Sequence, residues 1–213
     1  MTFVFKDLDF RFPKDGNAVS IALIGTSRSG KTTLLKHIYN TYFRKYMTIM
    51  FTMNSQAKIY KDLDSKILVC DTFHGELLRE AHALNKISDN RYPFLFISDD
   101  YVNTKIKNDP EIIKAYTIYR NSNISTISNF QSRTLMNSVG RNNLNYLFIF
   151  KQQTVRDWEA VIKEFLMMYF PIETSMREMI DFCKEHTKDH EFFFINNITC
   201  ECYMSKLTPS QVT

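Results

Sequence analysis

Short apolar runs alternate with segments of helical periodicity along most of the chain. The run at 94–98 is apolar almost throughout, as expected of a central parallel strand that is covered on both faces. Other short runs rich in β-branched and aromatic residues predict further strands at 18–24, 47–52, 66–70, 124–128 and 146–150. Apolar residues at helical spacing predict helices at 33–39, 76–84 and 112–119. Strands that alternate with helices favour a three-layer α/β/α fold around a mostly parallel sheet.

The last quarter of the chain follows a different pattern. Apolar residues recur at helical spacing over 154–168, where Thr154 is a candidate helix cap. A second helix is expected at 176–183. The apolar stretches 192–195 and 198–203 are separated by two asparagines and resemble a hairpin. We therefore predict a small C-terminal extension made of helices and a hairpin.

Length and pattern together predict a single domain. A chain of 213 residues is long enough to bury one sizeable core. Residues 3–5 are suited to a short edge strand, and a turn is expected at 13–17. We divide the domain into a lead-in at 1–17, an α/β core at 18–153 and the extension at 154–213.

A phosphate-binding signature lies between the first predicted strand and the first predicted helix. Residues 25–32 read Gly-Thr-Ser-Arg-Ser-Gly-Lys-Thr and match G-x-x-x-x-G-K-[ST]. The two glycines allow successive backbone N–H groups to point at phosphate oxygens, and the following helix presents its positive end to the same anion. In this motif Lys31 reaches the β- and γ-phosphates and the Thr32 hydroxyl binds Mg²⁺.

The alternative for this octet is a chance match in a turn rich in glycine and serine. The flanking strand and helix disfavour it, because they are the structural context that the motif requires. We therefore predict a bound nucleoside triphosphate. The expected contacts are Gly25, Thr26, Ser27, Arg28, Ser29, Gly30, Lys31, Thr32 and Thr33.

An acidic pair follows the apolar strand at 94–98. Asp99 stands where the second nucleotide-binding motif places the acid that holds the Mg²⁺ sphere. Asp100, beside it, is suited to polarise the attacking water as general base. The alternative is a pair that only ends a strand and begins a turn.

Polar and basic residues around the next two strands complete a candidate catalytic set. In motor-type P-loop ATPases an amide or hydroxyl residue at the end of the neighbouring strand senses the γ-phosphate. Gln131 is the preferred candidate for that role and Asn129 the second choice, although a surface glutamine without a role is also plausible. Arg120 and Arg141 each precede a strand and are candidates for an arginine contributed to a neighbouring subunit's site. A solvated surface arginine is the alternative for each.

The order of these motifs resembles a known family. The octet at 25–32, the run 94–100, Arg120 and a strand ending in Gln131 are similar to the genome-packaging ATPases of large DNA viruses and virophages. That family belongs to the FtsK–HerA superfamily of DNA-pumping motors, and the resemblance covers about residues 18–150. It implies an ASCE or RecA-like P-loop NTPase fold. Many members have Glu where this chain has Asp100.

The resemblance also implies roles for individual residues. Lys31 and Thr32 would bind ATP and Mg²⁺, and Asp99 would be the metal-associated acid. The remaining implied roles are the base, the sensor and the trans-acting finger, for Asp100, Gln131 and Arg120.

As an activity, the resemblance implies ATP hydrolysis that moves double-stranded DNA into capsids. The expected assembly is a homo-oligomeric ring, pentamer or hexamer, that contacts capsid or vertex proteins at an assembly site in the host cytoplasm or in the virion. Sequence-independent contacts to DNA phosphates would come from Arg44, Lys45, Lys105 and Lys107, unless these only form solvated faces. The alternatives are a small-molecule P-loop kinase and a non-hydrolysing nucleotide-dependent assembly scaffold.

Composition agrees with a globular protein of a reducing, cytosol-like compartment. Hydrophobic residues make up 44% and charged residues 23% of the chain, and no apolar run is long enough for a membrane span. The start of the chain lacks the pattern of a secretory signal. The net charge of +4 tolerates a polyanionic partner without requiring one.

The cysteines and histidines leave one further hypothesis open. Four cysteines at 70, 183, 200 and 202 form no repeating framework, which favours reduced thiols. His186 and His190 could join Cys200 and Cys202 in a tetrahedral Zn²⁺ site. The spacing matches no established zinc finger, so a hairpin that packs on the core is the alternative.

Overall fold

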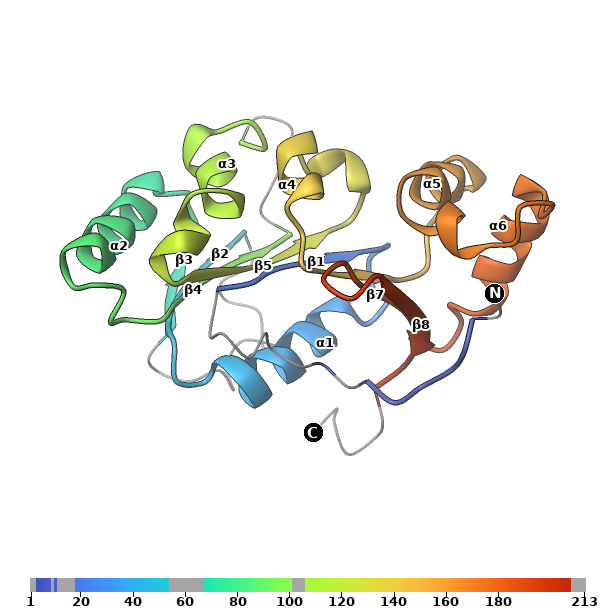
Figure 1. The fold of residues 1–213 in the computed structure, drawn as a ribbon, viewed down its shortest axis with the longest axis horizontal. Coiled ribbons are helices and arrows are strands. Elements are labelled where there is room, and N and C mark those ends of the chain that lie inside the picture. Colours follow the sequence, from blue (N-terminus) through green and yellow to red (C-terminus); the bar gives the residue numbers. More distant parts are fainter. Residues whose placement is uncertain (1–2, 9, 11–17, 54–66, 101–105, 208–213) are drawn as a thin grey trace.

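One eight-stranded sheet runs through the protein (Figure 1). The computed structural model describes residues 3–8, 10, 18–53, 67–100 and 106–207. The strand order is β3-β2-β4-β5-β1-β6-β7-β8, parallel from β3 to β6 and antiparallel from β6 to β8. The strands are β1 (Ser20–Ile24), β2 (Met47–Thr52), β3 (Ile67–Cys70), β4 (Phe94–Asp99), β5 (Ile124–Phe130), β6 (Tyr146–Ile149), β7 (Phe192–Asn196) and β8 (Glu201–Ser205).

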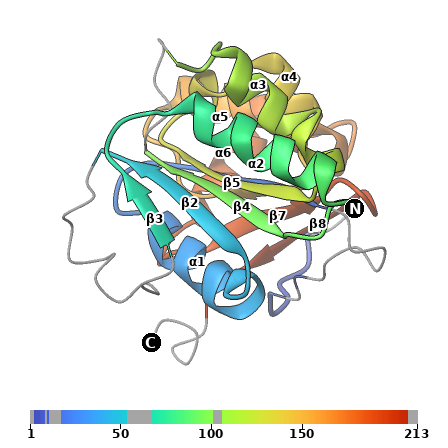
Figure 2. The same ribbon diagram turned by 90° about the vertical axis from the view of Figure 1, so that its left-hand side faces the viewer.

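Helices cover both faces of the sheet, and the two faces are covered unequally. Helix α1 (Lys31–Ile38) lies on one face, and the other helices lie on the opposite face (Figures 1 and 2). These are α2 (Gly75–Ile87), α3 (Pro110–Tyr116), α4 (Ser138–Asn142), α5 (Val155–Val161) and α6 (Met176–Glu185). The expected three-layer α/β/α fold is therefore confirmed.

Each face of the sheet has its own hydrophobic core. Leu34 and Leu35 of α1 belong to one core together with Phe148 of β6, whereas Phe96 of β4 and Trp158 of α5 belong to the other core. Because both faces are covered, every residue of β1, β4 and β5 is buried. This explains why β1 and β4 appear in the sequence as short, nearly continuous apolar runs, whereas β5 also buries the polar residues Ser125, Thr126, Ser128 and Asn129.

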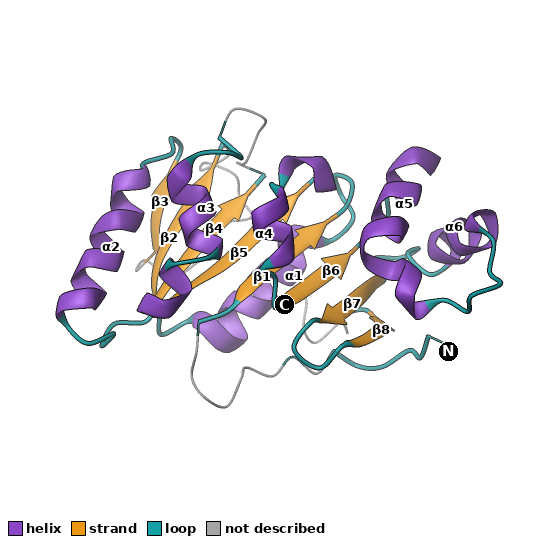
Figure 3. Cartoon of the chain, turned by 45° about the horizontal axis from the view of Figure 1, so that its top comes forward, coloured by secondary structure: helices purple, strands orange, loops and turns teal. Residues whose placement is uncertain are grey.

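The C-terminal elements extend the same sheet. Helices α5 and α6 lie beside each other at the end of the molecule where β7 and β8 form the sheet edge (Figure 3). The side chain of Thr154 accepts a hydrogen bond from the Asp157 N–H at 3.0 Å, so the expected cap of α5 is confirmed. Ser175 and Glu178 form a reciprocal capping box at the start of α6. No described helix is long and apolar enough to cross a membrane.

The expected elements are present, with three differences in detail. The single helix expected over 154–168 is divided, because the chain after α5 continues as a π-helical turn (Ile162–Leu166) and a 3₁₀ turn (Met167–Tyr169). Helix α4 was not expected, because five residues are too few to show a helical period. Of the apolar lead-in, Phe5 alone among the described residues forms a β-bridge, with Met204 of β8. The turn expected at 13–17 lies outside the described residues.

A buried asparagine fixes the chain that enters β4. Asn85 in α2 is fully buried and donates hydrogen bonds to the carbonyl oxygens of Tyr92 (2.7 Å) and Ser122 (2.6 Å). Its own side-chain oxygen accepts from the Tyr92 N–H at 3.1 Å. Helix α2 is thus joined to the segments that precede β4 and β5, the strands that carry the polar residues described below.

We predict that Asn85→Asp destabilises the fold. The substitution removes two donors and leaves a carboxylate among carbonyl oxygens, which costs about 3 kcal/mol of unfolding free energy. Urea denaturation followed by circular dichroism measures the change. Asn90→Asp is the matched control, since Asn90 donates to the Asn121 carbonyl at an exposed site. Equal stability of the two variants would contradict this account.

Candidate functional site

The phosphate-binding loop begins where β1 emerges between β5 and β6. The Gly25 N–H donates to the Phe130 carbonyl at 3.1 Å, and the Thr26 N–H donates to the Lys151 carbonyl at 2.9 Å. The first two residues of the loop are therefore held by the ends of both neighbouring strands. Since parallel strands end at one edge of the sheet, the loop shares that edge with the residues that follow β4 and β5.

Both glycines of the octet are required by the geometry. A Cβ atom at Gly25 would come within 2.6 Å of the Phe150 Cβ, so no larger residue fits against the end of β6. Gly30 has a φ of +103°, a backbone conformation that L side chains rarely adopt. The chain can therefore turn directly from β1 into α1.

The middle of the loop is open and its end is buried. Ser27 and Arg28 are exposed, and Arg28 has a left-handed φ of 62°. Ser29 is buried, and its hydroxyl has no hydrogen-bond partner among the described atoms. Thr26, Thr32 and Thr33 are half-buried. The structure thus places all nine residues expected to contact nucleotide on one continuous turn.

Lys31 is folded back over its own loop. Its Nζ donates to the carbonyl oxygens of Gly25 and Thr26, each at 2.7 Å, and the residue is only 4% exposed. Burial lowers the pKa of Lys31, while the charges of Asp100 and Asp99 act in the opposite direction. The ammonium is thus held beside two carboxylates, and its hydrogen bonds to loop carbonyls are ones that phosphate oxygens can replace.

Asp99 and Asn129 form a buried polar pair at the ends of β4 and β5. The two residues are register partners in the sheet and are each 1% exposed. The Asn129 Nδ2 donates a short hydrogen bond to the Asp99 Oδ1 and lies 3.5 Å from the Thr32 Oγ1. Asn129 therefore joins the acid after β4 to the hydroxyl at the start of α1.

These three residues fit a magnesium ion. A carboxylate, a hydroxyl and an amide oxygen are hard ligands of the kind that Mg²⁺ binds directly or through water. The Asn129 Oδ1 is buried and has no hydrogen-bond partner among the described atoms, so an acceptor is available beside Thr32 and Asp99. In the part of the chain that the structure describes, no group of three or more His, Cys, Asp or Glu side chains is arranged to hold a metal by itself.

Asp100 differs from Asp99 in its exposure. It follows β4 directly, is exposed, and has a left-handed φ of 51°. Its N–H donates to the Asn129 carbonyl at 3.3 Å, which keeps the turn against the end of β5. Asp100 is close enough to Lys31 for its charge to act on the pKa of that ammonium. The second acid therefore faces the loop from the solvent side.

Of the two candidate sensing residues, Gln131 and Asn129, the structure places Asn129 beside Asp99 and Thr32. Gln131 is exposed and lies just past β5, which continues through Phe130. Asn129 is still within the strand and contacts both Asp99 and Thr32.

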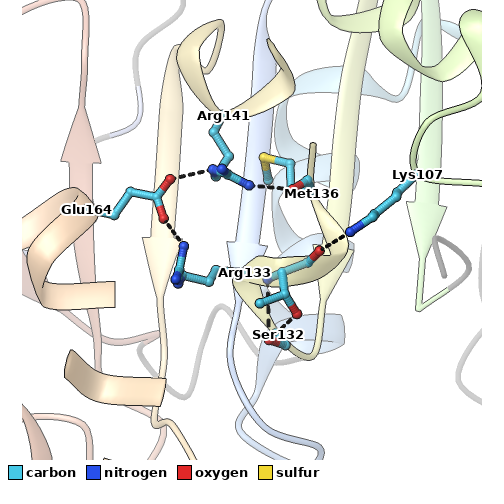
Figure 4. Close-up of polar contacts among 7 residues, drawn as sticks. Lys107, Ser132, Arg133, Met136, Arg141 and Glu164 are labelled. Atoms are coloured by element: carbon cyan, nitrogen blue, oxygen red, sulfur yellow. Dashed lines mark hydrogen bonds and ion pairs between the residues drawn. The ribbon is translucent and has the colours of Figure 1, made fainter. Parts of the chain in front are cut away.

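The two candidate arginines lie in different environments. Arg120 is half-buried in the 3₁₀ turn Tyr119–Ser122, which precedes β5 and so lies at the sheet edge opposite the loop. Arg141 in α4 forms an ion pair with Glu164, which also pairs with Arg133 (Figure 4). The guanidinium of Arg141 donates to the Met136 carbonyl at 2.6 Å as well. Neither arginine contacts the loop of its own chain in the described structure.

Sequence analysis missed several residues of this region. Gln152 is buried behind the loop and donates to the Phe150 carbonyl at 2.7 Å. Arg133 and Glu164 connect the segment after β5 to the π-helical turn after α5 (Figure 4). Gln152 lies two residues after the strand predicted at 146–150, which is a detectable signal. The pairing of Arg133 with Glu164 has none, because the two residues are far apart in the sequence.

The residues expected to contact DNA or to bind zinc lie in separate parts of the structure. Arg44 and Lys45 are exposed after the π-helical turn Tyr39–Phe43, and Lys107 donates to the Thr134 carbonyl at 3.1 Å. Lys105 lies outside the described residues. Of the zinc hypothesis, His186 packs on the Phe182 ring, whereas His190 lies against Gly30. Cys200 and Cys202 line a separate hollow beside Phe3 and Tyr169.

Solved structures with the same fold include genome-packaging enzymes. The DNA-packaging ATPase B204 from Sulfolobus turreted icosahedral virus is 15% identical, with a TM-score of 0.63 over 90% of this chain and 99% of that chain. The genome-packaging NTPase B204 from Sulfolobus turreted icosahedral virus 2, bound to AMPPCP, is 17% identical, with a TM-score of 0.64 over 91% and 99% of the two chains.

A conjugation protein has a related fold. The pCW3 conjugation coupling protein TcpA, bound to ATPγS, is 11% identical, with a TM-score of 0.59 over 89% of this chain and 60% of that chain. At these identities the likeness is one of fold. A search of curated proteins finds no significant match to the sequence.

A family profile matches almost the whole chain. The profile of the Poxvirus A32 protein family matches residues 14–204, from before β1 to within β8. The match therefore includes the loop, the Asp99–Asn129 pair and the C-terminal hairpin. The solved structures agree with the fold that the resemblance to packaging ATPases implies, and the profile match shows that this chain belongs to the Poxvirus A32 protein family.

Proposed function

We propose that this chain is an ATP-hydrolysing motor that packages viral double-stranded DNA into capsids. The observation that carries the proposal is the arrangement of Lys31 and Thr32 opposite the buried Asp99–Asn129 pair. A loop that only bound nucleotide would not need a buried carboxylate on β4 paired with a buried amide on β5. The family of the chain and its fold support the same activity.

In this motor the loop and α1 bind the triphosphate. Backbone N–H groups of the loop and the N-terminus of α1 face the phosphates, and the Lys31 ammonium exchanges its two carbonyl partners for phosphate oxygens. Mg²⁺ would be held by Thr32 and Asp99, with Asn129 orienting both side chains. The ion neutralises charge on the phosphates when it is bound.

Hydrolysis requires a base and a residue that positions water. Asp100 is exposed beside Lys31 and accepts the proton of the water that attacks the γ-phosphorus, as the bond to the leaving phosphate oxygen breaks. Asn129 positions the γ-phosphate end through its amide. Positioning and fixed dipoles supply most of the catalysis in phosphoryl transfer.

The motor acts as a ring of identical subunits. Arg120 lies at the sheet edge opposite its own loop, so it can serve only the site of a neighbouring subunit. Arg141 is paired with Glu164 and supports the α4 face instead. The ring surrounds DNA, docks on a capsid or vertex protein, and works at the viral assembly site in the host cytoplasm.

One experiment tests the proposal as a whole. ATP turnover is measured with and without linear double-stranded DNA, while light scattering gives the mass of the assembly. We expect an oligomer whose turnover rises when DNA is added. Phosphate transfer to a small acceptor, or nucleotide binding without turnover in either condition, would overturn the motor.

We predict that Lys31→Ala abolishes ATP turnover. The variant loses the cation that neutralises the β- and γ-phosphates, which lowers the rate by about 1,000-fold or more. A phosphate-release assay measures the loss. Lys36→Ala, on the same helix, is the control and should keep wild-type turnover.

We predict that substitutions of the two amide residues at the end of β5 have different effects on ATP turnover. Asn129→Ala should lower turnover by about 100-fold, because Asp99 and Thr32 lose the amide between them. Gln131→Ala should retain turnover within about threefold, as is usual for an exposed side chain. Steady-state kinetics at saturating ATP separate the two. The opposite ranking would restore Gln131 as the sensing residue.

We predict that Arg120 acts across the subunit boundary. Arg120→Ala should lower turnover by about 1,000-fold and leave the affinity for ATP unchanged, as loss of an arginine finger does. Mixing this variant with Lys31→Ala subunits should recover part of the turnover, since each supplies what the other lacks. Undiminished turnover of Arg120→Ala would refute the role. Arg141→Ala is the comparison and should lower thermal stability instead.

A further inference from the structure

A pocket of about 190 Å³ adjoins the phosphate loop on the side away from Asp99. Its lining residues come from the loop, the end of β6, the turn before β7 and the segment after β8. They are Gly30, Thr33, Phe150, Asp189, His190, Phe192 and Leu207. None of the catalytic roles described above uses the four residues from the C-terminal region.

The strand order decides which end of the nucleotide this pocket receives. Asp99 and Asn129 lie at the ends of β4 and β5, on one side of β1, whereas the pocket lies at β6 and β7 on the other side. Thr32 faces Asn129, while the next residue, Thr33, lines the pocket. A triphosphate whose γ end lies at the Asp99–Asn129 pair therefore extends across the loop toward the pocket with its nucleoside end.

The walls of the pocket have the chemistry of a nucleobase site. Phe150 and Phe192 are buried, with their ring centroids 5.1 Å apart, and form an apolar floor. The imidazole of His190 lies against Gly30, because a Cβ atom placed there would be 3.3 Å from its Nδ1. Asp189 adds an exposed carboxylate, an acceptor for an amino group. Flat apolar walls with one or two polar groups are typical of sites for small aromatic ligands.

The turn that carries both polar residues has an unusual backbone. Asp189 and His190 both have left-handed φ angles, 53° and 65°. A non-glycine residue with a left-handed φ costs on the order of 1 kcal/mol of conformational energy. The fold therefore holds two energetically unfavourable residues in succession at this turn. The Glu191 N–H donates to the Lys188 carbonyl at 3.0 Å and closes the turn. The pocket walls are thus held in place before any ligand binds.

We propose that this pocket binds the nucleobase of the triphosphate, with His190 against the ring and Asp189 accepting a hydrogen bond from the exocyclic amino group. The inference rests on the proposed function, since it extends the same nucleotide site. It gives the C-terminal hairpin region a direct part in nucleotide recognition. It also gives His190 a role other than the zinc site considered from the sequence.

Three probes separate the base from the phosphates: ATP, purine riboside triphosphate (which lacks the 6-amino group) and inorganic tripolyphosphate. Affinities are measured by calorimetry with the full chain. His190→Ala should weaken ATP about 10-fold through lost stacking, and leave tripolyphosphate within about twofold. Wild-type protein should prefer ATP to purine riboside triphosphate by about 10-fold, and Asp189→Ala should abolish that preference.

His74→Ala is the matched control, because its side chain is half-exposed and lies beyond β3, at the other end of the sheet. It should bind all three probes as wild type does. Wild type is expected to bind both ATP and tripolyphosphate. If His190→Ala and Asp189→Ala then bind every probe as tightly as wild type does, the nucleobase assignment is overturned, while the proposed motor function is unaffected. If wild type binds neither ATP nor tripolyphosphate, the proposed function falls, and this assignment with it.

Discussion

The nucleotide edge of this protein depends on the position of β1 between β5 and β6. Gly25 and Thr26 donate hydrogen bonds to the ends of the two neighbouring strands, so the start of the loop is fixed relative to the sheet. β1 is buried on both faces: Ala22 and Ile24 pack into one core, and Ile21 and Leu23 pack into the other. A shift of its register by one residue would exchange those side chains between the cores. The position of the loop is therefore fixed by the packing of β1 in both cores, and not by contacts within the loop alone.

The position of β1 also determines where the charged groups lie around the phosphate-binding loop. Lys31 is buried next to carboxylates on one side and bonded to loop carbonyls on the other. The carbonyl contacts satisfy the ammonium without a counter-ion in direct contact, and they can be exchanged for phosphate oxygens with little movement. Buried charge arranged in advance in this way reduces the reorganisation needed when nucleotide binds. Asn129 has the corresponding role for Asp99, because its amide holds the carboxylate beside Thr32.

Much of this arrangement was predictable from the sequence, and the exceptions have physical causes. The octet is a local motif, and the acids at 99 and 100 directly follow a continuous apolar strand, so both were found without a structure. Periodicity did not separate Asn129 from Gln131, because it locates the end of a strand only to within a few residues, and β5 continues through Phe130. The ion pairs of Glu164 could not be found, because they join residues brought together only by tertiary packing. The same is true of the contact between His190 and Gly30.

The lead-in segment has a consequence for how copies of this chain can meet. Met204 of β8 donates its N–H to the Val4 carbonyl at 3.0 Å, and its own carbonyl accepts from the Lys6 N–H at 2.9 Å. An uncovered edge strand presents such groups to any other strand, which is a common origin of aggregation. Here the chain occupies them itself, at Met204 near the end of β8. Copies of this chain are thereby discouraged from joining sheet to sheet at this part of the edge, which leaves association to side-chain surfaces.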